Sequence, residues 1–242
     1  MKIIRYTLNA NTPSTATDAH RDVRRGDLSE LPAGARLLPP CSPSKIICVA
    51  RNYVAHAKEL GNEVPADILI FLKPPSSLLA PEGKIVMPKF SQRVDYEGEL
   101  AVVIGKKCRH ATENEALSFV RGYTCANDVT ARDLQKSDGQ WTRGKGFDTF
   151  CPVGPVVVDT LDPWVGVDVE ARVNGQVKQQ GNTRDFIFSL DVVIRYIAQV
   201  MTLLPGDLIA TGTPSGVGPL VTGDRVEITV AGVGKLQNVV SD

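Results

Sequence analysis

The chain has 242 residues, of which 27 are Lys or Arg and 27 are Asp or Glu, so its formal net charge is zero. Such a balance provides no overall attraction to nucleic acid or to an anionic membrane surface, and we expect neither as a partner. Hydrophobic residues make up 43% of the chain and charged residues 22%, which is typical of a globular protein and argues against extensive disorder. No stretch approaches the roughly 18 apolar residues of a membrane span.

Five cysteines are scattered along the chain without a Cys-x-x-Cys pair: Cys41, Cys48, Cys108, Cys125 and Cys151. An odd number without paired spacing fits free thiols in a reducing compartment better than a disulfide framework or a zinc site. The first residues contain no apolar core of signal-peptide length. We therefore expect a cytoplasmic protein.

The N-terminal segment differs from the rest of the chain. A strand is predicted over residues 3–8, and residues 9–36 are polar and interrupted by glycine and proline. Leu38-Pro39-Pro40 then marks a junction. Because about 40 residues are too few to bury a core of their own, we predict a small N-terminal arm or subdomain over residues 1–40 and a main domain over residues 41–242.

From Lys45 onward, short apolar runs rich in β-branched residues alternate with turn residues, which is typical of strands. Predicted strands cover residues 45–50, 68–72, 96–104, 123–129, 152–158, 167–174, 176–181, 208–211 and 226–230. Asn174-Gly175 separates two of them and predicts a hairpin turn. Helices are predicted over residues 52–60, 114–120 and 189–203, the last from an apolar stripe at three- and four-residue spacing. Many strands and few helices indicate an α+β fold that is mainly β.

Two glutamates stand two residues apart in the predicted strand 96–104. Because side chains alternate between the faces of a strand, Glu97 and Glu99 project to the same side, as does Asp95 before them. Two ionised carboxylates side by side repel each other unless water solvates them, one takes a proton, or a cation lies between them. Considered alone, the segment is explained more simply as an edge strand with a solvated acidic face.

Asp128 makes a bound cation a better explanation than a solvated acidic edge strand. It stands near the end of the predicted strand 123–129, and carboxylates at strand ends beside a crevice suit a hard divalent cation with oxygen ligands. Mg²⁺ typically keeps several waters and takes few protein ligands, which leaves positions open for a substrate.

His56 and Glu59 lie three residues apart in the predicted helix 52–60, so their side chains share one face and can touch. A histidine oriented by a carboxylate can deprotonate water near neutral pH. On spacing alone, an ordinary pair on the surface of a helix is the simpler explanation. The glycine-rich stretch 211–218 lacks the Lys-Ser or Lys-Thr of a P-loop, and its bare N–H groups suit a carboxylate better.

Six motifs occur in a fixed order along the chain: Arg51-Asn-Tyr53, Phe71-Leu-Lys-Pro74, Asp95-Tyr-Glu-Gly-Glu-Leu-Ala-Val-Val-Ile-Gly105, Asn127-Asp-Val-Thr-Ala-Arg-Asp-Leu-Gln135, Lys145-Gly-Phe-Asp148 and Thr211-Gly-Thr-Pro-Ser-Gly-Val-Gly218. Through them the chain resembles the fumarylacetoacetate hydrolase family over nearly its whole length beyond the N-terminal arm. The resemblance implies a mixed β-sandwich roll with a few flanking helices, a catalytic domain of this family over residues 41–242 and, as is usual in the family, a homodimer.

The resemblance also implies roles for single residues. It makes Glu97, Glu99 and Asp128 the ligands of Mg²⁺ or Mn²⁺, and it places Lys145 beside the metal and the substrate oxygens as a catalytic residue. The residues that it implies for substrate binding are Arg51, Lys73, Arg132, Gln135 and Thr213.

Small hydrolase and decarboxylase members of the family carry His-x-x-Glu on a mobile lid that closes over the metal, and His56 and Glu59 match this catalytic pair. The namesake enzyme instead has a fourth carboxylate ligand upstream, whereas Cys48-Val-Ala-Arg51 contains no carboxylate. The chain therefore resembles the small-member branch, which includes acylpyruvate hydrolases, oxaloacetate decarboxylases and hydroxyheptadienedioate isomerases.

From these residues we expect a Mg²⁺-dependent hydrolase that cleaves a C–C bond in 2,4-dioxo acids of the acylpyruvate or fumarylpyruvate type through an enolate on the metal, with oxaloacetate decarboxylation as a further activity. One alternative is a 2-hydroxyhepta-2,4-diene-1,7-dioate isomerase or 5-oxopent-3-ene-1,2,5-tricarboxylate decarboxylase of aromatic degradation. It would need a second basic pocket, for which Arg51, Lys58 and Arg143 are candidates. Another alternative, from a different class, is a non-catalytic protein that binds a metal and a 2-oxo acid.

Overall fold

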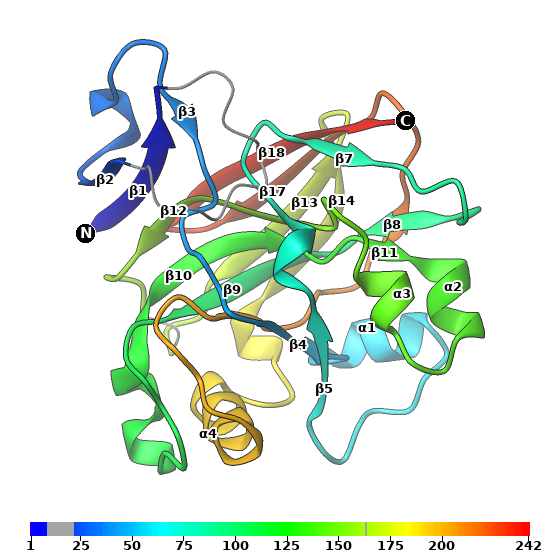
Figure 1. The fold of residues 1–242 in the computed structure, drawn as a ribbon. Helices are drawn as coiled ribbons and strands as arrows, with labels where there is room; N and C mark the ends of the chain where they lie inside the picture. The colour runs from blue at the N-terminus through cyan, green and yellow to red at the C-terminus, as the bar shows by residue number, and fades with distance from the viewer. Residues whose placement is uncertain (9–21, 163) are drawn as a thin grey trace.

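A ten-stranded mixed sheet dominates the computed structural model, which describes residues 1–8, 22–162 and 164–242 (Figure 1). Eight strands follow one another across it: β2 (Asp22–Arg25), β1 (Lys2–Thr7), β12 (Cys151–Val158), β10 (Val120–Asn127), β9 (Gly98–Ile104), β15 (Leu208–Ala210), β4 (Ile46–Ala50) and β5 (Leu69–Lys73). Two short strands lie beside this path, β3 (Arg36–Leu37) against β1 and β6 (Leu78–Leu79) against β12. Neighbouring strands are antiparallel except for β4 with β15 and β6 with β12.

Strand β9 lies in the middle of this sheet and is buried on both faces. Leu100 and Val102 join the larger hydrophobic core, whereas Ala101 and Val103 join a smaller core on the opposite face. A strand that is covered on both sides has no place for charged side chains along most of its length. Carboxylates are therefore confined to its beginning, where the site described below is built.

A five-stranded sheet packs across β9, β10 and β12 and completes the sandwich. Its strands, in order, are β14 (Gln176–Asn182), β13 (Asp168–Val173), β17 (Arg225–Val230), β18 (Gly234–Ser241) and β7 (Lys84–Val86). Gly98 is required at the contact between the sheets, since a Cβ there would lie 2.9 Å from the Ile228 side chain and 3.2 Å from that of Ala171. The predicted hairpin is confirmed, because Asn174 and Gly175 both adopt the left-handed conformation that a two-residue turn requires.

The single strand predicted over residues 96–104 is wrong, because the chain divides it at Glu97. Strand β8 (Val94–Tyr96) belongs to a three-stranded sheet with β11 (Thr130–Ala131) and β16 (Gly218–Pro219), whereas β9 belongs to the large sheet. The chain thus changes sheets at Glu97. The sequence does not show this division, since the alternation of side chains runs through it without interruption.

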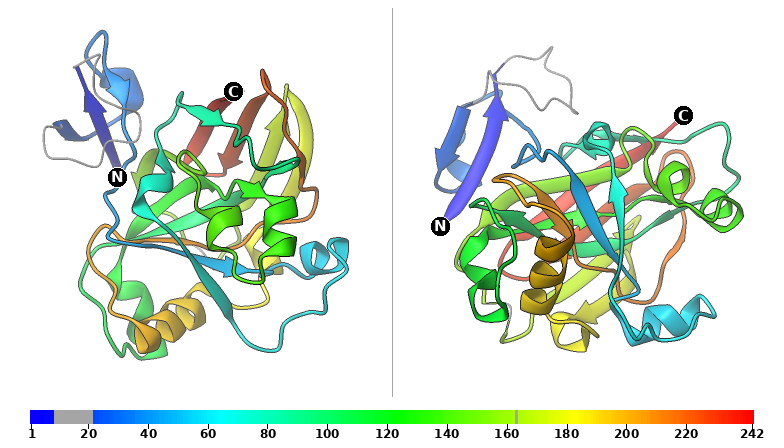
Figure 2. Two further views of the ribbon diagram at one scale, coloured as in Figure 1. Left: turned by 45° about the vertical axis from the view of Figure 1, so that its right-hand side comes forward. Right: turned by 60° about the horizontal axis from the view of Figure 1, so that its bottom comes forward.

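Four α-helices and four 3₁₀ segments flank the sheets in the described parts of the chain (Figure 2). They are α1 (Val54–Glu59), α2 (Arg132–Ser137), α3 (Thr142–Lys145), α4 (Leu190–Val200), η1 (Leu28–Glu30), η2 (Pro75–Ser77), η3 (Glu113–Phe119) and η4 (Thr183–Asp185). Helix α4 buries Val193, Ile194 and Ile197 in the larger core, which confirms the apolar stripe predicted there. Helix α1 confirms the helix predicted over residues 52–60, whereas the helix predicted over residues 114–120 is a 3₁₀ segment. The sequence did not predict α2 or α3, because neither has an apolar periodicity.

The N-terminal segment extends the large sheet rather than standing apart from it. Strand β1 pairs with β12, with Lys2 opposite Val158 and Ile3 opposite Val157, and β2 and β3 pair with β1. Residues 9–21 of the predicted arm lie outside the described residues. The division of the chain at residue 40 therefore stays a prediction. Among the described residues, no helix is long and apolar enough to cross a membrane.

Candidate functional site

The three carboxylates predicted as metal ligands lie together where β9 begins and β10 ends. Oxygen atoms of Glu97, Glu99 and Asp128 all lie within 4.8 Å of one another, and no residue of the three is more than 4% exposed. Strand pairing brings them together, since Glu99 stands opposite Ala126 in the ladder between β9 and β10. The backbone N–H of Asp128 donates to the Glu97 carbonyl at 2.9 Å, and Asn127 Oδ1 accepts from the Glu97 N–H at 2.9 Å.

Two buried lysines hold these carboxylates in place. Lys145, the last residue of α3, donates to Glu97 Oε2 and to Asp128 Oδ2, each at 2.7 Å. Lys73, the last residue of β5, donates to Asp128 Oδ1 at 2.6 Å and to the Val129 carbonyl at 3.0 Å. The two lysines are only 2% and 1% exposed. Buried ammonium groups need such partners, because the burial of an unpaired charge is costly.

Arg132, the first residue of α2, joins this cluster to a further buried carboxylate. Its guanidinium donates to Glu97 Oε1, to Asp95 Oδ2 at 2.8 Å and to Gln135 Oε1 at 2.7 Å. Asp95 is fully buried and also accepts two hydrogen bonds from Arg93. Each nitrogen atom of the Arg132 guanidinium thus has an acceptor, and the side chain is held in one orientation.

The surroundings affect the two glutamates in opposite ways. Burial by itself raises the pKa of the Glu97 carboxyl, but the charges of Lys145 and Arg132 outweigh it and hold this pKa well below its usual range. Burial likewise raises the pKa of Glu99, and the two neighbouring carboxylates raise it further, so that it lies well above its usual range. Among the described residues, Glu99 accepts a side-chain hydrogen bond only from the Gly212 N–H, at 2.8 Å.

This set of donors fits a hard divalent cation. Three carboxylates converge at the start of β9 and just beyond the end of β10, all are buried, and Glu99 has no direct ion pair within the described residues. Sites made of oxygen atoms alone suit Mg²⁺ or Mn²⁺. A cation at this position would also relieve the repulsion that raises the pKa of Glu99.

The predicted pair on α1 also forms. His56 Nδ1 lies 3.3 Å from Glu59 Oε2, and the His56 side chain is 6% exposed. Glu59 Oε1 accepts from the Gly216 N–H at 2.9 Å, and the buried Asn52 donates to the Thr211 carbonyl at 2.9 Å. These contacts fasten both ends of the segment that carries His56 to the loop that follows β15.

That loop reaches the pocket through Thr213. The Thr213 hydroxyl donates to the Gly98 carbonyl at 2.8 Å and accepts from Gln179 Nε2 at 2.8 Å. Gly212 before it has a φ of +101°, and a Cβ at this position would lie 2.7 Å from the Cβ of Asn52. Only glycine allows the loop to approach the residues just before α1 so closely. The loop is thus tied to the start of β9 through Thr213 and to α1 through the contact of Gly216 with Glu59.

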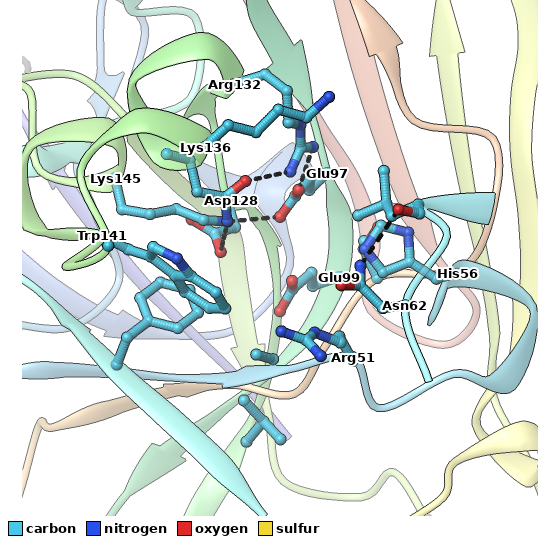
Figure 3. A pocket seen from close by; sticks show the side chains of 17 residues that line it. Arg51, His56, Asn62, Glu97, Glu99, Asp128, Arg132, Lys136, Trp141 and Lys145 are labelled. Carbon is cyan, nitrogen blue, oxygen red and sulfur yellow. Dashed lines mark hydrogen bonds and ion pairs between the residues drawn. The ribbon is translucent and has the colours of Figure 1, made fainter. Parts of the chain in front are cut away.

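These groups surround one pocket of about 310 Å³ (Figure 3). Phe71 and Trp141 form an apolar part of its wall, with their rings edge to face and the ring centroids 5.3 Å apart. The Lys145 ammonium lies 4.8 Å from the centre of the Phe71 ring, within the range of a cation–π contact. The pocket is lined by Val49, Ala50, Arg51, His56, Leu60, Asn62, Phe71, Glu97, Glu99, Asp128, Arg132, Gln135, Lys136, Gly139, Trp141, Lys145 and Thr213.

Nine of the eleven residues that the sequence predicts for the site line this pocket. The other two lie directly behind it, where Glu59 contacts His56 and Lys73 contacts Asp128. Lys73 therefore reaches the pocket only through Asp128.

Two polar lining residues were not predicted, Asn62 and Lys136. Lys136 follows Arg132 by four residues on α2, so helical spacing could have identified it, but α2 itself was not recognised. Of the cations considered for a second basic pocket, Lys58 and Arg143 do not line the pocket, and Arg143 is paired with Asp138.

The five cysteines are free and buried, as expected from their spacing. Burial raises the pKa of Cys41, Cys125 and Cys151 to about 12. These thiols stay protonated at neutral pH and pack in the interior.

The chain matches the model of the fumarylacetoacetate (FAA) hydrolase C-terminal domain over residues 45–241. Human mitochondrial oxaloacetate tautomerase FAHD2A is 42% identical over 233 residues, which cover 90% of this chain and 74% of the human protein. The structure of 2-hydroxyhepta-2,4-diene-1,7-dioate isomerase from Mycobacterium marinum has a TM-score of 0.85 at 40% identity. The match covers 100% of this chain and 98% of the isomerase chain. Fumarylpyruvate hydrolase from Pseudomonas aeruginosa, solved with Mn²⁺ and pyruvate, has a TM-score of 0.77 at 31% identity, with coverages of 82% and 90%.

The range that matches the family model contains every residue that lines the pocket. The structural neighbours also confirm the predicted fold class, a mainly β sandwich roll with a few flanking helices. The chain belongs to the fumarylacetoacetate hydrolase family.

Proposed function

We propose that this protein is a divalent-metal-dependent hydrolase that cleaves the C3–C4 bond of 2,4-dioxo acids of the acylpyruvate or fumarylpyruvate type. The observation that carries the proposal is the position of His56, which is oriented by Glu59 and lines the same pocket as the three carboxylates. A base and a metal centre in one pocket can act on the same small substrate. The structural likeness to a fumarylpyruvate hydrolase solved with Mn²⁺ and pyruvate supports this reaction.

We assign the metal to Glu97, Glu99 and Asp128, and when bound it supplies Lewis acidity toward the oxygen atoms of the 2-oxo acid. Lys145 adds positive charge beside the same carboxylates, where the 2-oxo oxygen gains electron density as the bond breaks. Lys73, buried behind Asp128, acts as a positioning residue.

The chain itself supplies the base for water. Because Nδ1 of His56 faces Glu59, its Nε2 is the atom that takes a proton from water. The oxygen of this water adds to the C4 carbonyl, and the C3–C4 bond breaks with its electron pair moving to the 2-oxo fragment. A proton returned to C3 completes pyruvate, and the acyl part leaves as a carboxylic acid. The first transfer needs a neutral imidazole, and the imidazolium that it forms is the donor of the proton returned to C3.

We assign substrate contacts to the predicted residues that line the pocket: Arg51, Arg132, Gln135 and Thr213. The hydroxyl of Thr213 and the guanidinium of Arg132 are both hydrogen-bonded within the protein. They therefore meet the substrate in fixed positions, which reduces the loss of side-chain freedom on binding.

A second candidate is an isomerase, tautomerase or decarboxylase of related diacids. It is favoured by the relatives named 2-hydroxyhepta-2,4-diene-1,7-dioate isomerase and oxaloacetate tautomerase, which are 40% and 42% identical to this chain. The same pocket would serve, because His56 could move a proton between carbon and oxygen atoms of the substrate without an attacking water.

The deciding experiment is a panel of acetylpyruvate, fumarylpyruvate, oxaloacetate and 2-hydroxyhepta-2,4-diene-1,7-dioate, each with Mg²⁺, with Mn²⁺ and with EDTA. Cleavage of a 2,4-dioxo acid that EDTA abolishes supports the hydrolase. Rapid isomerisation of the dienedioate, or tautomerisation or decarboxylation of oxaloacetate, without cleavage of either dioxo acid would replace it by the second candidate. A metal-loaded protein that binds one of these acids tightly and converts none would be a non-catalytic binder.

The remaining proposals concern the whole protein. We propose that it acts as a homodimer, as is usual in the family, and light scattering of the purified protein measures this. The buried free thiols favour a reducing compartment, and we propose the cytoplasm, which fractionation of the source cells tests.

A further inference from the structure

We infer that Arg51, supported by the charge of Lys136, binds a second carboxylate, so that the substrate is a dicarboxylic 2-oxo acid rather than one that ends in an alkyl chain. The inference rests on the proposed function and names the part of the substrate that this function leaves open. Both residues line the pocket that contains the three carboxylates. In Figure 3 Arg51 lies beside Glu99 and Lys136 lies beside Arg132, so that they stand on opposite sides of these carboxylates.

The other cations that line the pocket are already paired. Lys145 has Glu97 and Asp128 as partners, and Arg132 has Asp95 and Glu97. Arg51 and Lys136 have neither an ion pair nor a side-chain hydrogen bond within the described residues. Two positive charges in one pocket are thus available to a ligand.

Arg51 is the stronger of the two candidates because of where the backbone places it. It is half-buried, it directly follows β4, and its φ of 54° lies in the left-handed region. A residue with a Cβ loses about 1–2 kcal/mol in this conformation relative to the right-handed one. Glycine or asparagine would fit the backbone better, so an arginine here is explained by its side chain in the pocket rather than by the turn.

Lys136 contributes in a different way. Its side chain is exposed at the mouth of the pocket, one helical turn beyond Arg132 on α2. An exposed ammonium attracts an anion over a distance but forms a weak, salt-sensitive pair. A half-buried guanidinium can instead hold a carboxylate with two parallel hydrogen bonds. We therefore assign the direct contact to Arg51 and a supporting attraction to Lys136.

A pair of stable ligands tests this without any catalytic step. 2-Oxopentanedioate and 2-oxopentanoate have the same carbon chain and the same 2-oxo acid end, and only the first has a distal carboxylate. Calorimetric titration of the Mg²⁺-loaded protein should show that the dicarboxylate binds about 10- to 100-fold more tightly, as expected for hydrogen bonds to a charged group. Equal affinity for the two acids would overturn the inference.

Variants then assign the preference to residues. Arg51→Gln should remove most of the preference by weakening the dicarboxylate alone, and Arg51→Lys should restore part of it. Lys136→Gln should reduce the preference by about threefold, and its effect should vanish in about 1 M salt, where the Debye length is about 3 Å. Arg143→Gln, which removes an exposed arginine outside the pocket, is the matched control and should leave both affinities unchanged. Equal weakening of both acids by Arg51→Gln would contradict a distal role.

Turnover separates this inference from the proposed function. If the dicarboxylate preference is found but no 2,4-dioxo acid is cleaved, the hydrolase proposal fails and the anion site stands. If acetylpyruvate and fumarylpyruvate are cleaved with equal kcat/KM, the hydrolase stands and the anion site fails.

Discussion

The bottom of the pocket and its rim are built on opposite principles. The bottom consists of Glu97, Glu99, Asp128, Lys73 and Lys145, all buried and positioned by strand ends or by α3. The rim carries His56 on the six-residue helix α1, and Arg51 and Lys136 without partners within the described residues. At the bottom, Glu97, Asp128 and both lysines are held by ion pairs, whereas at the rim Arg51 and Lys136 are left available to a ligand. Under the proposed function, the bottom would hold the reacting 2-oxo acid group, which is common to these substrates, and the rim would select and attack the part of the substrate that varies.

The largest effect should come from the bottom of the pocket. Glu97→Ala removes a carboxylate that both Lys145 and Arg132 contact, and it should abolish Mg²⁺ binding and activity together. Because two buried cations lose a partner, the free energy of unfolding should also fall by about 3–5 kcal/mol. Calorimetry with Mg²⁺ and urea denaturation measure the two effects. Glu170→Ala, which removes a surface carboxylate paired with Arg172, should change stability by no more than about 1 kcal/mol.

A smaller and more selective effect is expected at the rim. His56→Ala should lower kcat for hydrolysis by about 10²- to 10⁴-fold, the usual contribution of a general base. Binding of Mg²⁺ should stay unchanged, because among the described contacts no residue of α1 forms a hydrogen bond or an ion pair with Glu97, Glu99 or Asp128. Calorimetry and steady-state kinetics on the same preparation give both values, with Lys58→Ala as a control on the same helix. Full activity in His56→Ala would remove the base from the mechanism.

A substitution of Lys73 tests whether metal binding at the bottom of the pocket depends on a residue that does not line the pocket. Lys73→Met keeps most of the side-chain volume but removes the hydrogen bond to Asp128, which then retains only Lys145. Affinity for Mg²⁺ should fall by about 10- to 100-fold, as for other residues that orient metal ligands. At saturating Mg²⁺, kcat should recover to near the original value. A loss of kcat that excess Mg²⁺ does not repair would indicate a direct catalytic role for Lys73.

The smallest effect is expected far from both regions, at the hairpin between β13 and β14. Gly175→Ala introduces a Cβ at a φ of +79° where no atom lies within 4 Å, so only the backbone conformation is penalised. Stability should fall by about 1–2 kcal/mol, and kcat/KM at room temperature should not change. Urea denaturation and steady-state assays check this. Reduced activity would show that the second sheet transmits strain to the pocket through Gly98, where it meets β9.

Most of the strands and most of the residues that line the pocket's polar surface could be predicted from the sequence. Alternation of apolar and polar residues predicted the β-rich core, and Asn174-Gly175 predicted its hairpin, because both are local properties of the chain. Glu97 and Glu99 could be placed on one side by their spacing of two. The resemblance of six ordered motifs then joined them to Asp128, Lys145 and the residues of the rim.

Tertiary structure alone decided how the charges are paired. It divided the predicted strand at Glu97, placed Lys73 behind Asp128 instead of in the pocket, and left Arg51 without a partner within the described residues. It also brought Lys136 to the pocket on a helix that has no apolar periodicity. These outcomes depend on contacts between residues far apart in the chain, and local patterns contain no information about them. A charged residue has the same sequence signature whether it is buried against a counter-charge or left open to a ligand, and only packing distinguishes the two.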